Sequence, residues 1–196
     1  MTITAAVLAG GQSRRMGTDK SLVELAGRPL IQHVLDRLRP LGWPILLVAN
    51  HADRYQSLGE TIVADVLPGK GSLGGIYTAL HHSATEFTFC VACDMPFLNT
   101  ALIRWLATLD EEADAVVPVV AGRAQGLHAL YRRRCLPVIS EQLARDELRI
   151  SAVYDRLAVR FVAEADLRQY DPVLRSFRNV NTPEDLGLAR QIIEAD

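Results

Sequence analysis

Short apolar runs alternate with segments of helical periodicity along this chain, and this rhythm constrains the fold more than any other feature. Ile3 to Leu8 is an apolar, β-rich run, and apolar residues then recur at helical spacing from Pro29 to Leu38. The pattern continues with apolar runs at 45–48, 61–64 and 87–92 and a helical segment at 73–80. Strands that alternate with helices imply right-handed βαβ crossovers and a mostly parallel sheet covered on both faces. We therefore predict a three-layer α/β fold.

The rhythm is less regular beyond residue 97. We expect helices at 101–109, 136–143 and 151–157, and strands at 115–119, 127–131 and 159–162. A closing amphipathic helix runs from Pro183 to Ile193, with Thr182 as its N-cap and Asp185 three positions later. No internal repeat, low-complexity segment or linker divides the chain. Its 196 residues therefore fit a single domain that covers residues 1–196.

Composition and charge narrow the range of partners. Charged residues make up 22% of the chain and hydrophobic residues 49%, which is typical of an ordinary globular protein. A formal net charge of -2 provides no basic field for a nucleic-acid backbone. No stretch approaches the roughly 20 apolar residues that span a bilayer, and the N-terminus lacks the zones of a signal peptide. We expect a cytoplasmic protein that binds neither nucleic acid nor membranes.

The segment after the first strand is dense in glycines, hydroxyl groups and cations. Residues 8–20 read Leu-Ala-Gly-Gly-Gln-Ser-Arg-Arg-Met-Gly-Thr-Asp-Lys. Glycines let a backbone approach a polyanion, and Arg15 and Lys20 supply positive charge at the carboxyl end of a strand, where open sheets bind ligands. The segment has neither the Walker spacing nor the dinucleotide fingerprint. It favours a phosphate-binding loop, and the alternative is a solvated turn with surface charges.

A carboxylate follows the fourth strand at the same expected edge of the sheet. Asp94, in the segment Cys-Asp-Met-Pro-Phe, suits Mg²⁺, which needs only one or two protein carboxylates besides phosphate oxygens and water. The alternative is an Asp that caps a loop before a turn-forming Pro. Cys90 and Cys93 have a C-x-x-C spacing, but no second Cys/His pair follows, so buried structural thiols are favoured over a redox or metal pair. His128 lies in an apolar strand and is expected in the core.

The glycine-rich loop resembles the signature of nucleotidyltransferases that attach a nucleotide to the molybdenum cofactor, specifically the molybdenum cofactor guanylyltransferases. The matching residues are Leu8, Ala9, Gly10, Gly11, Ser13, Arg15, Met16, Gly17, Asp19 and Lys20. This resemblance implies a Rossmann-like nucleotidyltransferase fold in which the loop wraps a triphosphate and Arg15 and Lys20 neutralise it. Relatives that use cytidine tend to begin this loop with Pro-Ala-Ala-Gly, so the resemblance favours guanine.

Further segments extend the resemblance. Residues 93–97 resemble the family's magnesium motif, which implies Asp94 as the metal ligand, and residues 68–75 resemble its Gly-Pro-Leu-x-Gly segment, with Ser72 where proline is common. Residues 177–186 resemble its Asn-x-Asn-Thr-Pro element. That match implies that Asn179 and Asn181 face the pterin, although both residues could also be loop amides beside the Thr182 cap.

The resemblance assigns a role to each matched residue. It implies catalysis by Arg15, Lys20 and Asp94, and nucleotide binding by Leu8, Ala9, Gly10, Gly11, Lys20, Asn50, Asp65 and Asp94. An Asn at position 50 also suits a turn. Arg149 roughly matches a basic residue of the family that is proposed to bind the acceptor's phosphate. Together with the Asn-x-Asn match, the resemblance implies that Arg149, Asn179 and Asn181 bind the acceptor.

The resemblance implies a reaction between the terminal phosphate of molybdopterin, with or without molybdenum, and the α-phosphorus of GTP, with release of pyrophosphate. An anionic nucleophile needs alignment and charge neutralisation rather than a strong base. The implied partners are GTP, molybdopterin or the molybdenum cofactor, and molybdoenzymes or their chaperones, with Mg²⁺ as cofactor. The rivals are a relative that uses CTP or another phosphorylated acceptor, a sugar-phosphate nucleotidyltransferase, and a nucleotide-binding accessory protein without catalysis. The joint presence of Arg15, Lys20 and Asp94 argues against the accessory protein.

Overall fold

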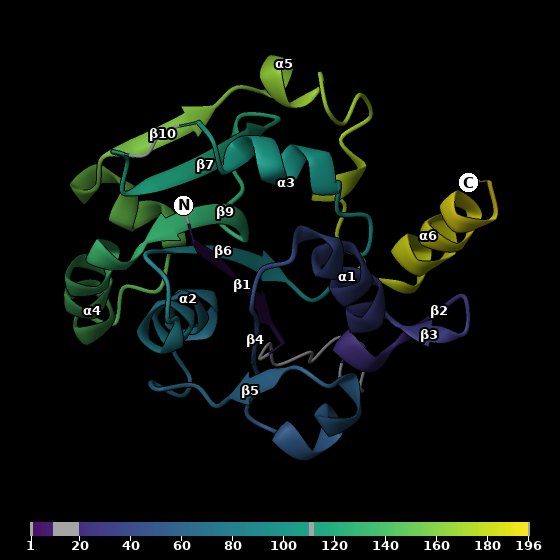
Figure 1. Ribbon diagram of the computed structural model, residues 1–196, viewed down its shortest axis with the longest axis horizontal. Coiled ribbons are helices and arrows are strands. Elements are labelled where there is room, and N and C mark those ends of the chain that lie inside the picture. The colour runs from purple at the N-terminus through teal and green to yellow at the C-terminus, as the bar shows by residue number, and fades with distance from the viewer. Residues whose placement is uncertain (1, 10–19, 110–111, 196) are drawn as a thin grey trace.

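A sheet of eight strands forms the middle layer of the molecule. The computed structural model describes residues 2–9, 20–109 and 112–195. The strands of the sheet are β1 (Ile3–Leu8), β4 (Ile45–Val48), β5 (Thr61–Val63), β6 (Phe87–Ala92), β7 (Ala115–Val120), β8 (Arg123–Ala124), β9 (His128–Arg132) and β10 (Val159–Val162). Within the described residues their order is β10-β7-β9-β6-β1-β4-β5, with β8 paired to β7 outside this path. Figure 1 shows this order from β10 at the top to β5 at the bottom.

The pairing of these strands confirms the prediction of a mostly parallel sheet. β1 lies between β4 and β6 and is parallel to both, and β5 is parallel to β4. β10 is parallel to β7, whereas β9 is antiparallel to both of its neighbours, β6 and β7. Because β1, β4, β5 and β6 share one direction, their carboxyl ends meet at a single edge of the sheet.

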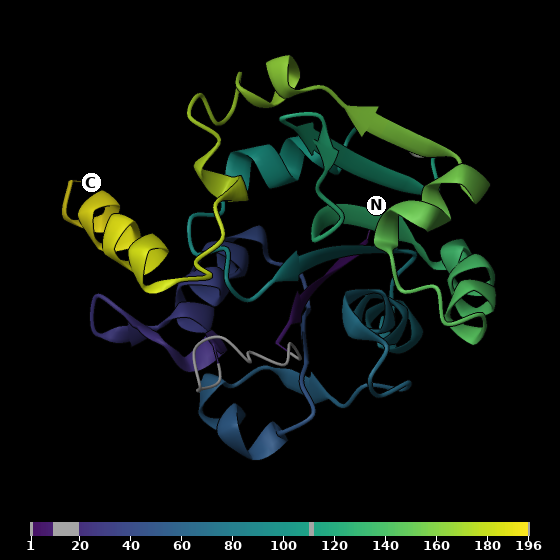
Figure 2. The ribbon, with the colours of Figure 1, turned by 180° about the vertical axis from the view of Figure 1, so that it is seen from behind.

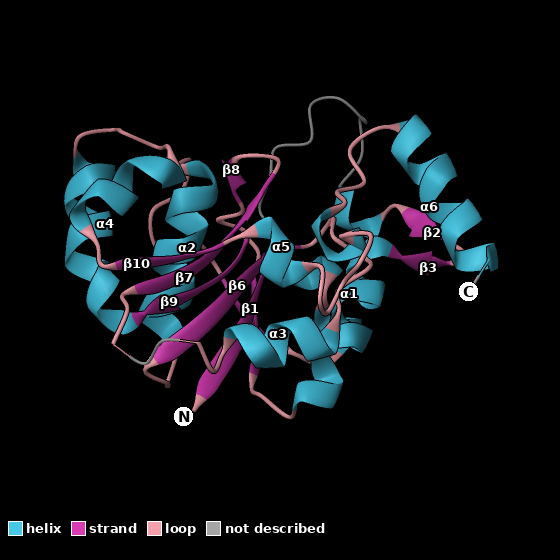
Figure 3. Cartoon of the chain, turned by 90° about the horizontal axis from the view of Figure 1, so that it is seen from above, coloured by secondary structure: helices cyan, strands magenta, loops and turns pink. Residues whose placement is uncertain are grey.

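Helices cover both faces of the sheet, which confirms the predicted three layers. They are α1 (Leu30–Leu38), α2 (Gly71–His82), α3 (Thr100–Leu106), α4 (Leu136–Ala144), α5 (Glu164–Leu167) and α6 (Pro183–Ala195). Figure 3 shows α1 and α3 on one face and α2 and α4 on the other. In the part of the chain that the structure describes, none of the helices combines the length and the apolar character that crossing a membrane requires.

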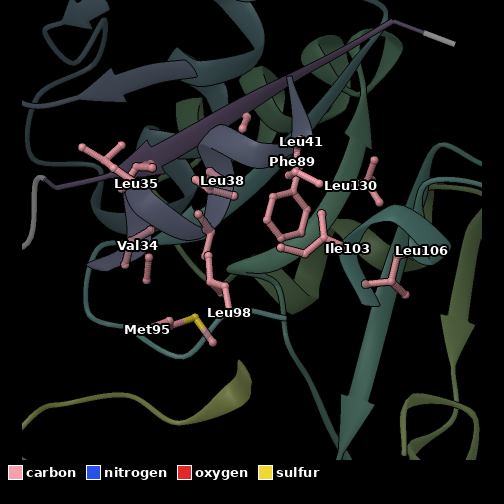
Figure 4. Close-up of a cluster of buried hydrophobic side chains, with 14 of the residues drawn as sticks. Val34, Leu35, Leu38, Leu41, Phe89, Met95, Leu98, Ile103, Leu106 and Leu130 are labelled. Carbon is pink, nitrogen blue, oxygen red and sulfur yellow. The ribbon is translucent and has the colours of Figure 1, made fainter. Parts of the chain in front are cut away.

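The sheet separates two hydrophobic cores. Along β1, Ile3, Ala5 and Val7 belong to one core, and Ala6 and Leu8 belong to the other. This alternation places apolar side chains on both faces, as a central strand between two helical layers requires. Figure 4 shows part of the first core, to which α1, β6, β9 and α3 contribute Val34, Leu35, Leu38, Phe89, Leu130, Ile103 and Leu106.

A short hairpin and the last helix form a smaller third cluster. Strands β2 (Glu24–Leu25) and β3 (Arg28–Pro29) pair antiparallel, and the two turn residues, Ala26 and Gly27, have φ angles of 50° and 75°. Two positive φ values in succession are the mark of a type I′ hairpin. Helix α6 lies beside this hairpin (Figure 2), and the buried members of the cluster are Leu25, Leu30, Val180 and Ala189. This hairpin, which follows closely after the turn Lys20–Leu22, was not predicted from the sequence.

Candidate active site

The carboxyl edge of the parallel strands gathers several of the residues that the sequence singles out. Leu8 ends β1, and its carbonyl accepts a hydrogen bond of 3.2 Å from the backbone N–H of Cys93, just beyond β6. The N–H of Ala9 donates to the carbonyl of Val48 at 2.9 Å. Leu8 and Ala9 are both buried, so the side chains of these two residues belong to the core.

Asn50 and Asp65 form a reciprocal pair at this edge. Asn50 follows β4 and Asp65 follows β5. The side-chain amide of Asn50 donates to Oδ2 of Asp65 at 2.8 Å, and the backbone N–H of Asp65 donates to Oδ1 of Asn50 at 2.9 Å. The two bonds fix the orientation of both side chains relative to the sheet. The structure therefore brings together two of the residues that the resemblance assigned to the nucleotide.

Asp94 lies at the carboxyl end of β6 and is held by the C-terminal segment. Its Oδ1 accepts a hydrogen bond of 2.8 Å from the side-chain amide of Asn179, and its carbonyl accepts one of 2.9 Å from the N–H of Val180. Asp94 is 9% exposed, whereas Asn179 is exposed. A carboxylate so buried needs polar partners, and Asn179 supplies one without adding charge. The contact joins residues 85 positions apart, and no local sequence pattern indicated it.

A magnesium ion fits this donor set. Among the described residues, no group of three or more His, Cys, Asp or Glu side chains gathers in a cluster that could hold a metal by itself. Mg²⁺ does not need such a cluster, because it keeps several waters and binds one or two carboxylates together with phosphate oxygens. Asp94, at the sheet edge where ligands of open α/β sheets bind, has the hard oxygen donors that this ion prefers.

Several predicted residues lie outside the described part of the chain. They are Gly10, Gly11 and Arg15. The backbone of Lys20 is described, and it begins a 3-10 turn that spans Lys20–Leu22. The segment at 68–75, which resembles the family's Gly-Pro-Leu-x-Gly segment, is a loop only as far as Lys70, because α2 begins at Gly71.

Asn181 belongs to the start of α6 rather than to the Asp94 contact. Its backbone N–H donates to Oδ2 of Asp185 at 2.9 Å, as does the N–H of Thr182. In return, the N–H of Asp185 donates to Oγ1 of Thr182 at 3.1 Å. The predicted capping arrangement is therefore confirmed. The two asparagines thus differ in these contacts: the side chain of Asn179 bonds to Asp94, whereas the backbone of Asn181 bonds to Asp185.

Arg149 lies on a different segment, between α4 and β10. Its side chain is 80% exposed and lies 3.4 Å from Glu147, while its carbonyl accepts a bond of 2.8 Å from the buried Gln142. An ion pair of 2.8 Å between Lys70 and Asp146 ties this segment to the loop before α2. The guanidinium of Arg149 is thus accessible to a ligand.

His128 is a core residue, as expected. It is fully buried between the rings of Phe89 and Phe177, at centroid distances of 5.2 Å and 4.5 Å. Neither ring nitrogen has a hydrogen-bond partner among the described residues. Burial lowers the pKa of His128 to about 3, so the ring is neutral and takes no part in proton transfer at neutral pH.

Cys90, Cys93 and Cys135 all lie in the described part of the chain, where they form no disulfide. Cys90 and Cys135 are buried, and burial raises the pKa of both, to about 12 for Cys135. A thiol with a raised pKa is a poor nucleophile and a poor metal ligand. For Cys90, this supports a structural thiol over a member of a redox or metal pair. Cys93 is half-buried.

Comparison with known proteins gives a consistent result. Residues 5–161 match the model of the MobA-like NTP transferase domain. The chain is 38% identical over 195 residues to the molybdenum cofactor guanylyltransferase of Desulfosudis oleivorans, covering 98% of this chain and 96% of that protein. It is 35% identical over 184 residues to the molybdenum cofactor guanylyltransferase of Vibrio cholerae, covering 92% and 88%. The crystal structure of molybdopterin-guanine dinucleotide biosynthesis protein A from Archaeoglobus fulgidus superposes with a TM-score of 0.87 at 29% identity, covering 98% of this chain and 100% of that one.

Proposed function

The chain belongs to the MobA-like NTP transferase family and is a nucleotidyltransferase, and from this premise we propose that it transfers GMP from GTP to molybdopterin or the molybdenum cofactor. The acceptor is the terminal phosphate of the pterin, and the products are the guanine dinucleotide cofactor and pyrophosphate. We also propose that one domain, residues 1–196, carries the whole activity, and that the reaction takes place in the cytoplasm. The names of the relatives support guanine as the base.

The observation that carries this proposal is the buried carboxylate of Asp94 beside the end of β1. The side-chain amide of Asn179 orients the carboxylate of Asp94 through a bond of 2.8 Å. A buried, oriented carboxylate at this edge of the sheet is suited to a divalent cation that accompanies a triphosphate. When bound there, Mg²⁺ would neutralise phosphate charge.

The chemistry requires alignment more than proton transfer. An anionic oxygen of the pterin phosphate attacks the α-phosphorus of GTP, a new P–O bond forms, and the bond from the α-phosphorus to the bridging oxygen of pyrophosphate breaks. In this proposal Arg15 and Lys20 neutralise the triphosphate, and backbone groups of residues 8–11 approach it. Positive charge at the reacting phosphates lowers the repulsion between two anions and stabilises the charge that moves onto pyrophosphate.

The nucleotide and acceptor sides of the site use different residues. We assign Asn50 and Asp65 to the nucleotide because their paired side chains are fixed at the carboxyl ends of neighbouring strands, where open sheets bind ligands. We assign Asn181 and the exposed Arg149 to the acceptor. We also assign Asn179 to the acceptor, and its side chain bonds to Asp94. Molybdoenzymes or their chaperones would receive the product.

A product assay tests the proposal directly. Purified protein is incubated with molybdopterin, Mg²⁺ and equal concentrations of GTP and CTP, and the dinucleotide and pyrophosphate are measured. We expect the guanine dinucleotide in a one-to-one ratio with pyrophosphate. A cytosine product would reassign the base. Binding of GTP with no turnover on any pterin acceptor would instead identify a nucleotide-binding accessory protein.

A further inference from the structure

A buried pair of hydroxyl groups links two segments of the nucleotide side. The hydroxyl oxygens of Ser21 and Tyr55 lie 2.7 Å apart, and each residue is only 1% exposed. Ser21 directly follows Lys20, within the 3-10 turn Lys20–Leu22. Tyr55 lies in the loop that follows Asn50. The pair thus joins the turn that begins at Lys20 to the loop that begins at Asn50.

The backbone around Tyr55 is fixed on both sides. Tyr55 lies between the 3-10 turns Ala52–Arg54 and Gln56–Leu58. Its N–H donates to the carbonyl of Ala52 at 3.0 Å, and its own carbonyl accepts from the N–H of Leu58 at 3.0 Å. The ring belongs to the core shared by α1 and the sheet. The backbone hydrogen bonds and the buried ring therefore hold the phenol oxygen in place, and its contact with Ser21 restrains the position of the Ser21 hydroxyl.

The linkage continues to a third segment. Asn50 is bonded to Asp65 in both directions, at 2.8 Å and 2.9 Å. A path of hydrogen bonds and short turns therefore runs from the Lys20 turn through Ser21 and Tyr55 to Asn50 and Asp65. Asn50 follows β4 and Asp65 follows β5, which are neighbours in the sheet. The path therefore ties the Lys20 turn to the carboxyl ends of two parallel strands.

We propose that Tyr55 is a positioning residue for nucleotide binding, acting through Ser21 on the backbone of Lys20. The inference rests on the proposed function, in which Lys20 and Asn50 contact the same GTP molecule. Two contacts on one ligand must keep a fixed separation if both are to form, and preorganising them lowers the free energy cost of binding. A polar pair suits this task, because a hydrogen bond between two buried hydroxyls depends on the distance and angle between them and so favours one arrangement of the two segments.

The test compares single and double variants of the full-length chain. Tyr55→Phe, Ser21→Ala and the double variant remove one or both hydroxyls, and Thr4→Val is the matched control. Thr4 and Thr85 form another hydroxyl contact, partly buried and 2.9 Å long, near the start of β1 at the opposite edge of the sheet. The measurements are the equilibrium affinity for GTP with Mg²⁺, the KM for GTP and for molybdopterin, kcat, and thermal stability.

We expect each single variant to weaken GTP binding by about 3-fold to 10-fold, since one buried hydrogen bond is lost, while the KM for molybdopterin stays within about two-fold. Thr4→Val should lower thermal stability without changing the affinity for GTP or the KM for molybdopterin. The double variant tests whether the two hydroxyls act through their shared contact. That contact is lost in all three variants, so the GTP affinity of the double variant should be as weak as in the singles, not weaker by the product of the two single effects.

Several results would overturn the inference. One is Tyr55→Phe with wild-type GTP affinity and kcat, and another is a double variant whose loss of GTP affinity equals the product of the two single losses. Failure of the proposed function has a different signature. A wild type that binds GTP but transfers it to no pterin acceptor would refute that function, while the comparison of GTP affinities among the variants would still decide the role of Tyr55. A wild type that does not bind GTP would refute both.

Discussion

The side-chain amide of Asn179 donates a hydrogen bond of 2.8 Å to Oδ1 of Asp94, across 85 positions of sequence. The next residue, Val180, adds a backbone bond to the carbonyl of Asp94 at 2.9 Å. The C-terminal segment thus closes over the end of β6, and Asp94 is left 9% exposed. The carboxylate that we assign to the metal depends for its orientation on a residue near the other end of the chain.

We expect Asp94→Ala to abolish pyrophosphate release while the protein stays folded. Loss of a group that stabilises charge at a reacting phosphate costs on the order of 100-fold or more in turnover. Pyrophosphate release with GTP and molybdopterin measures the loss, and circular dichroism with a thermal scan checks the fold. Full activity in a folded Asp94→Ala variant would rule out its assigned role.

We expect Asn179→Ala to raise the Mg²⁺ concentration needed for half-maximal activity. Removal of a residue that orients a metal ligand typically weakens metal binding by about 10-fold to 100-fold. Titration of pyrophosphate release with Mg²⁺ at saturating GTP measures the shift. Asn181→Ala is the control, because Asn181 lies at the α6 cap: it should raise the KM for the acceptor and leave the Mg²⁺ midpoint unchanged. Equal Mg²⁺ midpoints for Asn179→Ala and the wild type would contradict the proposed role of Asn179 in orienting Asp94.

The Asn50 and Asp65 pair allows a charge swap. Asn50→Asp places two carboxylates in contact and should reduce both stability and GTP affinity. The swap Asn50→Asp with Asp65→Asn restores an amide donor opposite a carboxylate, so stability should return. We expect GTP affinity to stay at least about five-fold weaker in the swap, because the charge has moved to the other strand. Isothermal titration measures the affinity, and wild-type affinity in the swap would show that the position of the charge is unimportant.

We expect Thr182→Ala to lower the free energy of unfolding by about 1 kcal/mol, the usual cost of removing an N-cap side chain. Its hydroxyl oxygen accepts the N–H of Asp185 at 3.1 Å at the start of α6. Thr182→Ser keeps this oxygen and is the control. Chemical denaturation measures the difference, and amide hydrogen exchange within α6 shows whether the loss is confined to that helix. Exchange rates in α6 that are the same in both variants would contradict the capping role.

Much of the fold could be predicted because parallel strands that are buried on both faces are recognisable in the sequence. The bounds of β1, β4, β6 and β10 are those read from the sequence, since each strand is a short apolar run that ends at polar residues or turns. The hairpin of β2 and β3 escaped prediction because its turn is Ala26-Gly27. Ala rarely adopts a positive φ, so nothing local marked a type I′ turn.

Helix ends were harder to predict than strand ends. Helix α2 begins at Gly71, two residues before the predicted start, and continues through Gly74 and Gly75, which disfavour helix when taken alone. Packing explains the tolerance: a Cβ on Gly75 would lie 3.1 Å from a methyl group of Leu8, so the missing side chain lets α2 approach β1 closely. Tertiary contact thus outweighs local propensity.

The site was predictable in its parts but not in its connections. Asp94, Asn50 and Asp65 could be placed at one edge because each follows a parallel strand. The bond from Asn179 to Asp94 and the contact of Ser21 with Tyr55 could not, because both depend on how distant segments meet in space. The roles of the site residues stay predictions until the variants are measured.

The buried ring of His128 should make stability depend on pH in a defined window. Burial lowers the pKa of His128 to about 3 in the folded protein, while a histidine in the unfolded chain has a pKa of about 6.5. As the pH falls below about 6.5, the unfolded state therefore gains a proton that the folded state does not take up. The contribution of His128 to the free energy of unfolding is thus fully present above about pH 6.5, and it is lost as the pH falls toward about 3.

Comparison with His128→Phe isolates this contribution, because both proteins share all other titrating groups. Each pH unit within the window costs about 1.4 kcal/mol for one such proton. Between pH 7.5 and pH 4.5 the wild type should therefore lose about 2–3 kcal/mol more than the variant, as measured by chemical denaturation. Phenylalanine retains a ring between Phe89 and Phe177 and removes the two ring nitrogens that have no hydrogen-bond partner among the described residues, so the variant should remain folded at neutral pH. If the two stability curves ran parallel from pH 7.5 to pH 4.5, His128 would have to be able to accept a proton inside the folded core, and its environment would not be the apolar one described.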